Sequence, residues 1–490
     1  MLYHLGMYSA LAQLKQSNRV LEQVLTLGTA LIVCLGCIFG IGIRVEAQSE
    51  KDPMLVHYTK AHDALRSGDQ DSACLEYKAF VGEAIHRIAN ARARIGDLGA
   101  VDQNFTEALS FANESSEVRL DYASVLFDQN RLAESRSMAQ SALDLDPGNA
   151  RAETVLGRIS FQERRYPEAA AQLEAAAAAG GFGENWRLLT LAYLRSQQPD
   201  RAKPALALAL RTLGDTARTR VLIAMTYYYG DYPQDAIAEL RKALALDPRA
   251  PDAHYFLGLA YLANNEAAGY ATAVPEFEAQ LQVYPEDFRA RYMLGYIALQ
   301  QHQFVEAEQE LLQATRINPS DAGTKLLLAQ LYSETGRGKQ AESVLRALTT
   351  APKNGRPVDF TIIRAHYMLG RLLQQEGQIQ DGASEIGVAE KLRRELRASA
   401  GEAYAARTST VLAGQDSNNA LPQPALPAAH VSPEEQARVR AFVQQLGPMI
   451  GEAYYTLGGI SALHKDPETA SRYSARAVAW DPSLASLVSH

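Results

Sequence analysis

Apolar and small residues recur along most of the chain with the spacing of amphipathic helices, and these helical stretches come in pairs. An aromatic-rich segment such as VLIAMTYYYGDYPQDA is followed by an Ala-rich segment such as AIAELRKALALDP. A proline then closes the pair, because proline cannot continue a helix. The pattern predicts an all-α chain of helix–turn–helix units. The closing dipeptides are Asp146-Pro147, Asp247-Pro248, Tyr284-Pro285, Asn318-Pro319 and Asp481-Pro482.

The pairs repeat at a nearly constant interval. Copies begin at residues 82, 116, 150, 183, 217, 251, 288 and 322, so successive starts are 34, 34, 33, 34, 34, 37 and 34 residues apart. Further copies are expected at 54–81, 363–396 and 451–484. Repeats of this length bury their apolar faces against their neighbours, which predicts one continuous core instead of several separate domains.

The repeated residues resemble the tetratricopeptide repeat, whose pattern is W-x2-L-G-x2-Y, then A-x3-F, then A, then P. This resemblance covers about ten copies and implies a solenoid of antiparallel helix pairs. Small residues at the eighth and twentieth positions would let the helices approach closely. In this family the first helix of each repeat lines an inner groove. The copy at 251–287 carries Leu257, Gly258, Tyr261, Ala273, Phe277 and Pro285.

The periodicity divides the chain into an array at 54–412, a linker at 413–431 and a final part at 432–490. The linker reads AGQDSNNALPQPALPAAHV, a composition typical of flexible segments. Ser432-Pro433-Glu434-Glu435 then predicts a helix start, with a capping serine, proline in the first turn and acidic residues at the positive end of the helix dipole. That helix leads into the final repeat copy.

The first 47 residues predict export. Residues 24–43 form an uncharged apolar run of a length that spans a bilayer, with Lys15 and Arg19 before it. Residues 45–47 (Val-Glu-Ala) fit a signal-peptidase site. A cleaved signal peptide and a retained membrane anchor both fit. Either topology places everything after residue 47 outside the cytoplasm, in a periplasmic, membrane-anchored or secreted protein.

Composition and motifs argue against several functions. With 48 basic and 56 acidic residues the chain has a formal charge of −8, so a generally basic nucleic-acid binder is excluded. Only Cys74 follows the apolar run, so that part has no intrachain disulfide. Phosphate-loop, nucleophile-elbow and zinc-protease motifs are absent from the sequence. We therefore expect no catalytic, cofactor or metal site, and we expect His57 and His62 to be ordinary surface histidines.

The groove positions implied by the resemblance are unusually basic for an acidic protein. Copies 150 to 363 place eight arginines there against three acidic residues, Glu184, Asp252 and Glu334. Arginine and tyrosine anchor many protein interfaces, although tyrosine also packs between repeats. The predicted partner-binding residues are Arg151, Arg158, Arg187, Arg195, Arg218, Tyr228, Tyr255, Arg289, Tyr292, Tyr296, Arg364, Tyr367 and Arg371, with Phe161 and Tyr229 beside them.

These features together predict a non-enzymatic scaffold of the cell envelope or extracytoplasmic space that binds other proteins or acidic peptide segments in an Arg/Tyr-lined groove. An accessory or assembly subunit of an envelope, secretion or glycosylation complex, with catalysis in another chain, is the alternative. The membrane would be a further partner, through residues 24–43, if that segment is not cleaved. The sequence does not determine the oligomeric state.

Overall fold

The computed structural model describes residues 52–264, 266–350, 360–412 and 431–488, and every regular element in these ranges is helical. The predicted all-α fold is confirmed. None of the described helices is long and apolar enough to cross a membrane. The predicted signal or anchor at 1–47 and residues 413–430 of the predicted linker lie outside the described ranges.

The chain divides into two compact units. The central unit comprises residues 122–430, and the terminal unit combines residues 1–121 with residues 431–490. Helix α6 (Ser116–Asp128) contains the boundary at residue 121. The chain therefore contributes to the terminal unit twice, before and after the central unit.

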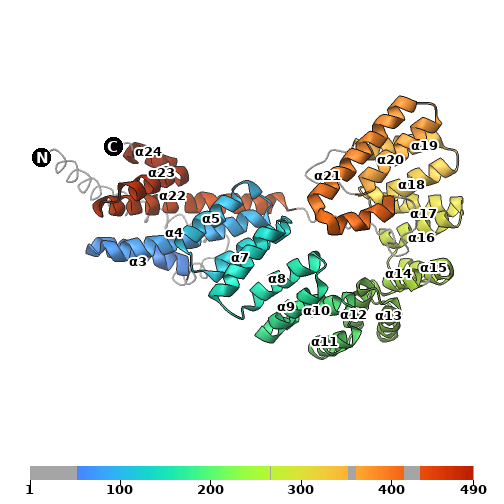
Figure 1. Ribbon diagram of the computed structural model, residues 1–490, viewed down its shortest axis with the longest axis horizontal. Coiled ribbons are helices and arrows are strands. Elements are labelled where there is room, and N and C mark those ends of the chain that lie inside the picture. Colours follow the sequence, from blue (N-terminus) through green and yellow to red (C-terminus); the bar gives the residue numbers. More distant parts are fainter. Residues whose placement is uncertain (1–51, 265, 351–359, 413–430, 489–490) are drawn as a thin grey trace, which may run out of the picture. The chain divides into compact units, whose positions relative to one another are not determined.

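The central unit stacks its helices in consecutive antiparallel pairs (Figure 1). A short π-helical segment, Ala177–Gly181, joins α9 to α10. The helices of this unit after α6 are α7 (Leu132–Leu145), α8 (Ala150–Gln162), α9 (Tyr166–Ala176), α10 (Phe182–Arg195), α11 (Pro199–Leu213), α12 (Ala217–Gly230), α13 (Pro233–Leu246), α14 (Ala253–Asn264), α15 (Glu266–Val283), α16 (Phe288–Gln300), α17 (Phe304–Ile317), α18 (Ala322–Glu334), α19 (Gly338–Thr349), α20 (Phe360–Gln375) and α21 (Ile379–Leu412).

The turn inside each pair confirms the repeat register. The fifteenth residue of each copy has a left-handed backbone with φ between 59° and 84°, which ends the first helix and lets the chain reverse. The copy at 251–287 is not part of this comparison because its fifteenth residue, 265, is not described. The fifteenth residues are Gly68, Gly96, Asn130, Arg164, Gln197, Asp231, His302, Gly336, Gly377 and Lys465.

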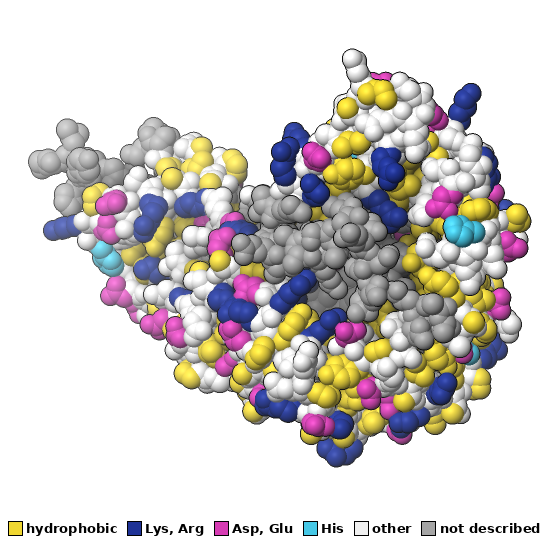
Figure 2. Space-filling model, turned by 45° about the vertical axis from the view of Figure 1, so that its right-hand side comes forward, with side chains coloured by type: hydrophobic (Ala, Val, Ile, Leu, Met, Phe, Trp, Pro, Cys, Tyr) yellow, Lys and Arg dark blue, Asp and Glu magenta, His cyan; other side chains and the backbone are white. Residues whose placement is uncertain are grey.

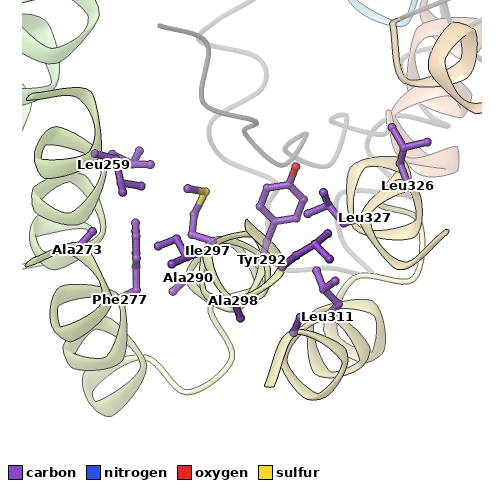
Figure 3. Close-up of a cluster of buried hydrophobic side chains, with 14 of the residues drawn as sticks. Leu259, Ala273, Phe277, Ala290, Tyr292, Ile297, Ala298, Leu311, Leu326 and Leu327 are labelled. Carbon is purple, nitrogen blue, oxygen red and sulfur yellow. The ribbon is translucent and has the colours of Figure 1, made fainter. Parts of the chain in front are cut away.

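Small residues permit the close helix contacts that the pattern predicts. A Cβ atom added to Gly258 would lie 2.7 Å from the ring of Phe277, and one added to Gly295 would lie 2.7 Å from Leu311. Alanine at the twentieth position, such as Ala236 or Ala307, is fully buried. The larger apolar side chains fill the space between these contacts, each contributing about 1.5–3 kcal/mol through burial. Figure 3 shows this core, with Phe277 facing α16 and Leu311 facing it from the opposite side.

The terminal unit contains two helices that are longer than a repeat requires. Helix α4 joins the copies that begin at residues 54 and 82 into one continuous helix, and α22 continues through Pro448 into the final copy. Ser432 caps α22 by accepting from the Glu435 amide, as the sequence predicts. The helices are α3 (Pro53–Ser67), α4 (Gln70–Arg94), α5 (Val101–Phe111), α22 (Pro433–Leu463), α23 (Pro467–Trp480) and α24 (Ala485–Val488), with 3-10 turns at Leu98–Ala100 and Pro482–Leu484.

The final repeat copy packs on the first described helices, with α22 against α4. Glu107 of α5, whose side chain is only 9% exposed, lies at the centre of this interface. It accepts a 2.5 Å hydrogen bond from the Tyr454 hydroxyl and a 2.8 Å hydrogen bond from Nε of Arg476. Phe111 packs against the Tyr454 ring, with the centroids 5.7 Å apart. Tyr58 of α3 also donates a 2.6 Å hydrogen bond to Glu452 of α22.

Candidate functional site

All of the predicted partner-binding residues lie in the central unit, on the first helix of a pair. They are carried by α8, α10, α12, α14, α16 and α20. Because equivalent helices stack in the same order in a solenoid, these residues belong to one type of surface. We call this set of helices the inner helices.

The predicted residues differ in exposure. The tyrosines of α14 and α16 at the fifth repeat position, Tyr255 and Tyr292, are only 3% and 2% exposed and pack in the core. Their rings offer little surface to a partner. The exposed members are Arg151, Arg195, Arg218, Arg364 and Arg371, and the half-buried ones are Arg158, Arg187, Tyr228, Arg289, Tyr296 and Tyr367.

Two of the predicted arginines are held by the protein itself. Arg289 forms ion pairs with Asp287, at 2.8 Å, and with Asp252. Its guanidinium also lies over the Tyr255 ring, 4.6 Å from the centroid. Burial lowers the pKa of Arg289, but hydrogen bonds to Asp287 and then Asp252 outweigh it and raise the pKa overall. Arg289 is thus a fixed part of the fold whose charge is already neutralised.

Arg158 is a weaker case of the same kind. It lies 3.7 Å from Asp128 and stacks over the Phe127 ring, with its guanidinium carbon 4.2 Å from the centroid. Asp128 is 72% exposed, so water screens this pair and it contributes little.

Other inner-helix arginines keep their charge available. Among the described residues no ion pair involves Arg187, Arg195, Arg218 or Arg371. Arg364 donates a hydrogen bond to the neutral Gln330 amide, at 3.2 Å. Nε of Arg187 is buried without a hydrogen-bond partner. An arginine in this condition gains from an external carboxylate, because the new partner replaces hydration that burial has already removed.

An aromatic group lies among these arginines. Tyr228 and Tyr229 of α12 contact each other at 5.4 Å between centroids, and both contact Phe256 of α14 at about 6 Å. Burial raises the pKa of Tyr229, while the charges of Arg187 and Arg289 act to lower it. Those two arginines therefore lie within electrostatic range of the Tyr229 ring, which is 37% exposed.

On the face seen in Figure 2, dark blue Lys and Arg side chains are interspersed with magenta Asp and Glu side chains. They do not gather into one large basic patch.

Three histidines help to pair the two helices of a repeat. The fourth position of several repeats pairs with a glutamate on the second helix of the same repeat. Arg220 reaches Glu239 at 2.7 Å and Arg291 reaches Glu310 at 3.0 Å. Three other repeats have a histidine at this fourth position, and the pairs are His57–Glu76, His254–Glu276 and His366–Glu385, at 2.6–2.7 Å.

In the described part of the chain, no three His, Cys, Asp or Glu side chains are grouped so that they could hold a metal ion.

The sequence did not identify Asp287 as a site residue, although it determines the state of Arg289. It follows a closing dipeptide, Tyr284-Pro285, and only that dipeptide stood out at this place in the sequence. Its position at the N-cap of α16, two residues before an arginine, was the available signal. Glu107 gave no comparable signal, because its partners lie about 350 residues away in sequence.

Comparisons with known proteins agree with the repeat structure. A family model described as "Tetratricopeptide repeat" matches residues 120–184 and 266–322, and a second described as "TPR repeat" matches 227–265. A protein named "Cellulose synthase operon protein C", from Xanthomonas axonopodis pv. citri, is 28% identical over 264 residues. That alignment covers 51% of this chain and 15% of the relative, so the chain spans only a small part of its length.

Solved structures with similar helices include a tetratricopeptide repeat protein from Parabacteroides merdae, which is 17% identical with a TM-score of 0.35. That match covers 56% of this chain and 93% of the other. Yeast Tom70 is 16% identical with a TM-score of 0.33, over 89% and 99% of the two chains. The family-model matches, the constant register of the left-handed turns and the stacked helix pairs together show that the chain contains tetratricopeptide repeats.

Proposed function

We propose that this protein is a non-enzymatic scaffold whose inner helices bind carboxylate-rich segments of partner proteins. The observation that supports this most directly is a group of inner-helix arginines for which no described residue provides an acidic partner: Arg187, Arg195, Arg218 and Arg371. Arg187 in particular lies within electrostatic range of the partly exposed Tyr229 ring. A carboxylate side chain could form a bidentate bond with an arginine while the neighbouring aromatic ring packs against its stem.

We further propose that the scaffold works outside the cytoplasm, as part of the cell envelope. The apolar segment at 24–43 supports export. The relative named as a cellulose synthase operon protein supports a role beside an envelope enzyme system. In this role the chain would be an accessory subunit of the enzyme system, and another protein would carry out the catalysis.

The proposed groove can be tested with a charge-reversal variant. Arg187, Arg195 and Arg218 are changed together to glutamate, and binding of a fluorescein-labelled, glutamate-rich 12-residue peptide is followed by anisotropy at several salt concentrations. We expect the wild type to bind with an affinity that falls as salt rises, and the variant to lose binding. Circular dichroism checks that both are folded. Arg289 is left unchanged because its ion pairs belong to the fold.

A matched variant separates local recognition from net charge. Arg211, Arg241 and Arg316 are exposed residues on the second helices α11, α13 and α17. Changing these three to glutamate alters the charge by the same amount and should leave peptide binding near the wild-type value. Equal losses in both triple variants would reject the inner helices as the binding surface.

A further inference from the structure

The repeats of the central unit are joined less firmly at one junction than at the others. In general the second helix of a repeat packs along the first helix of the next, as α13 does on α14 and α19 does on α20. Helix α11 contacts α12 much less extensively than any other such pair between α7 and α20. The second helix therefore contributes little to holding the repeats that begin at residues 183 and 217 together.

The first helices of the same two repeats are unusually close. Helices α10 and α12 lie side by side and contact each other more than any other two successive inner helices do (Figure 1). Gly230 of α12 permits this approach, because a Cβ atom added to it would lie 2.6 Å from Cδ1 of Leu194 in α10. Leu194 is only 1% exposed, and the half-buried Tyr227 packs against the same group of side chains. The junction is thus tight on one side and weak on the other.

The buried side chains show the same division. A large apolar cluster extends from Val221 of α12 to Leu373 of α20. Helix α11 belongs instead to a small cluster at this junction, whose buried members are Trp186, Leu206, Ala209 and Ile223. Because buried apolar contacts are what resist the separation of packed elements, a contact that rests on so small a cluster opens more easily.

The connection from α11 to α12 lacks the proline that closes other repeats. Gly214 stands where the repeats that begin at residues 217 and 288 have Pro248 and Pro319. Its backbone has φ of 82° and ψ of 154°, a region that is essentially restricted to glycine. Proline would fix φ near about −65°. Glycine therefore leaves free the backbone angle that proline fixes in those repeats.

We propose that the junction between α11 and α12 is a hinge, with the contact between Leu194 and Gly230 as its pivot. The helices up to α11 and those from α12 onward each move as a packed block, and Gly214 takes up the change in backbone angles. A hinge needs one close contact that is kept, a second contact weak enough to open, and a few connecting residues that can turn. This junction has all three.

The hinge lies inside the surface that carries the inner-helix arginines. Arg187 and Arg195 belong to α10, before the hinge, whereas Arg218 and Tyr229 belong to α12, after it. Rotation about the pivot changes the spacing between these two groups without disrupting either block. The inner surface can then adjust to partner segments of different bulk. The hinge does not depend on the proposed ligand, because it follows from packing within the chain alone.

Distance measurements between spin labels test the hinge. The full-length chain, with its three cysteines changed to serine, carries the labels for double electron–electron resonance. Labels on Ala175 of α9 and Arg241 of α13 span the hinge, whereas labels on Arg241 and Leu312 of α17 span the same number of repeats beyond it. All three positions are exposed. We expect the first distance distribution to be about twofold broader than the second. Equal widths would overturn the hinge.

A substitution at the connection tests the role of Gly214. Gly214→Pro restores the closing proline and should narrow the distribution of the hinge-spanning pair towards that of the control pair. Pro248→Gly makes the converse change at the next junction and should leave the Arg241/Leu312 distribution narrow, since α13 still packs on α14. A folded Gly214→Pro variant with an unchanged distribution would contradict the hinge. If circular dichroism shows that this variant does not fold, the two pairs without it decide the question.

Hydrogen exchange gives a second readout that needs no substitution. Residues 206–216 and 240–250 are equivalent segments of successive repeats, each containing the end of a second helix and the connection that follows it. Amides of the first segment should exchange about tenfold faster than those of the second. Equal protection would reject the hinge. Failure of the glutamate-rich peptide to bind would leave both measurements unchanged, so the hinge and the proposed function can fail independently.

Discussion

The central and terminal units hold their helices together across very different distances along the chain. In the central unit a typical ion pair, such as Arg220–Glu239, joins residues 19 apart. In the terminal unit Tyr58 bonds to Glu452, which is 394 residues away, and Glu107 bonds to Tyr454 and Arg476, which are 347 and 369 residues away. Similar helix pairs can thus be assembled from neighbouring segments or from opposite ends of a chain.

This difference predicts different responses to mutation. Each pair in the central unit is supported by its neighbours, so damage should spread through adjacent repeats. The terminal unit depends on one interface between separated segments, and that interface is centred on a buried carboxylate. Hydrogen exchange measured by mass spectrometry can follow peptides of each unit separately, which makes the comparison testable.

The largest effect is expected for Ala236→Glu in the central unit. Ala236 is fully buried in α13, and a glutamate there would be both too large and charged without a partner. We expect a loss of about 4–5 kcal/mol in the stability of the surrounding repeats. Exchange should accelerate in α12 to α15. Ala238→Glu, at an exposed position of the same helix, is the control. Unchanged exchange in the Ala236 variant would mean that the repeat register is wrong.

Glu107→Ala should break the terminal unit with a slightly smaller loss, about 3–4 kcal/mol, because it leaves Arg476 half-buried without its partner. Peptides from α5, α22 and α23 should exchange faster, whereas those of α14 to α17 should not. Glu434→Ala removes an ion pair whose side chains are about 75% exposed, and it should change neither region. Equal protection of α22 in the wild type and the Glu107 variant would contradict the role of the interface.

The stability of the terminal unit should also depend on pH. His86 of α4 is buried; burial lowers its pKa, but hydrogen bonds to Asp121 and Glu83 outweigh this and raise it to about 9. Asn90 and the Phe105 ring also lie beside it. The folded pKa exceeds the unfolded value of 6.5, so the stabilisation is complete below pH 6.5 and is lost as the pH rises through 9.

The loss corresponds to about 3 kcal/mol across that interval. Denaturant unfolding of the wild type between pH 6 and 10 should reveal it, and His86→Gln should remove this dependence. A wild-type curve parallel to that of the variant would show that the histidine is not charged in the folded protein.

The smallest change in stability is expected for a substitution in the turn between two helices. Gln197 is exposed and has a left-handed backbone with φ of 60°. Gln197→Gly removes that strain but increases the freedom of the unfolded chain, so we expect a net stabilisation below about 1 kcal/mol. Gln162→Gly, in the last turn of α8, should instead destabilise by a similar amount. Thermal unfolding of both variants measures the contrast, and a destabilised Gln197 variant would contradict it.

The sequence predicted the repeats well because their physics is local. Gly258 and Ala273 must be small for the two helices of one pair to touch, and this requirement recurs wherever the pair recurs. The start of α22 at Ser432 was predictable for the same reason, since a cap depends on the few residues that follow it.

The site was only partly predictable. The inner-helix positions of the arginines follow from the register, but whether an arginine is available depends on acids from other repeats. Arg289 and Arg218 look alike in the sequence, yet only Arg289 meets Asp252 and Asp287. Tyr255 and Tyr292 occupy positions from which a side chain can face either the groove or the next helix. In the structure both rings pack in the core. The role of Glu107 could not be inferred because a helical glutamate normally faces water.

The separation between Tyr58 and Glu452 also has a consequence for synthesis of the protein. At roughly 5–20 residues per second, a ribosome needs about 20–80 seconds to make the intervening 394 residues. During that time α4 and α5 have been made while α22 and α23 have not, so Phe111 and Glu107 lack their partners. The nascent chain must keep this surface from associating wrongly until its last repeat emerges.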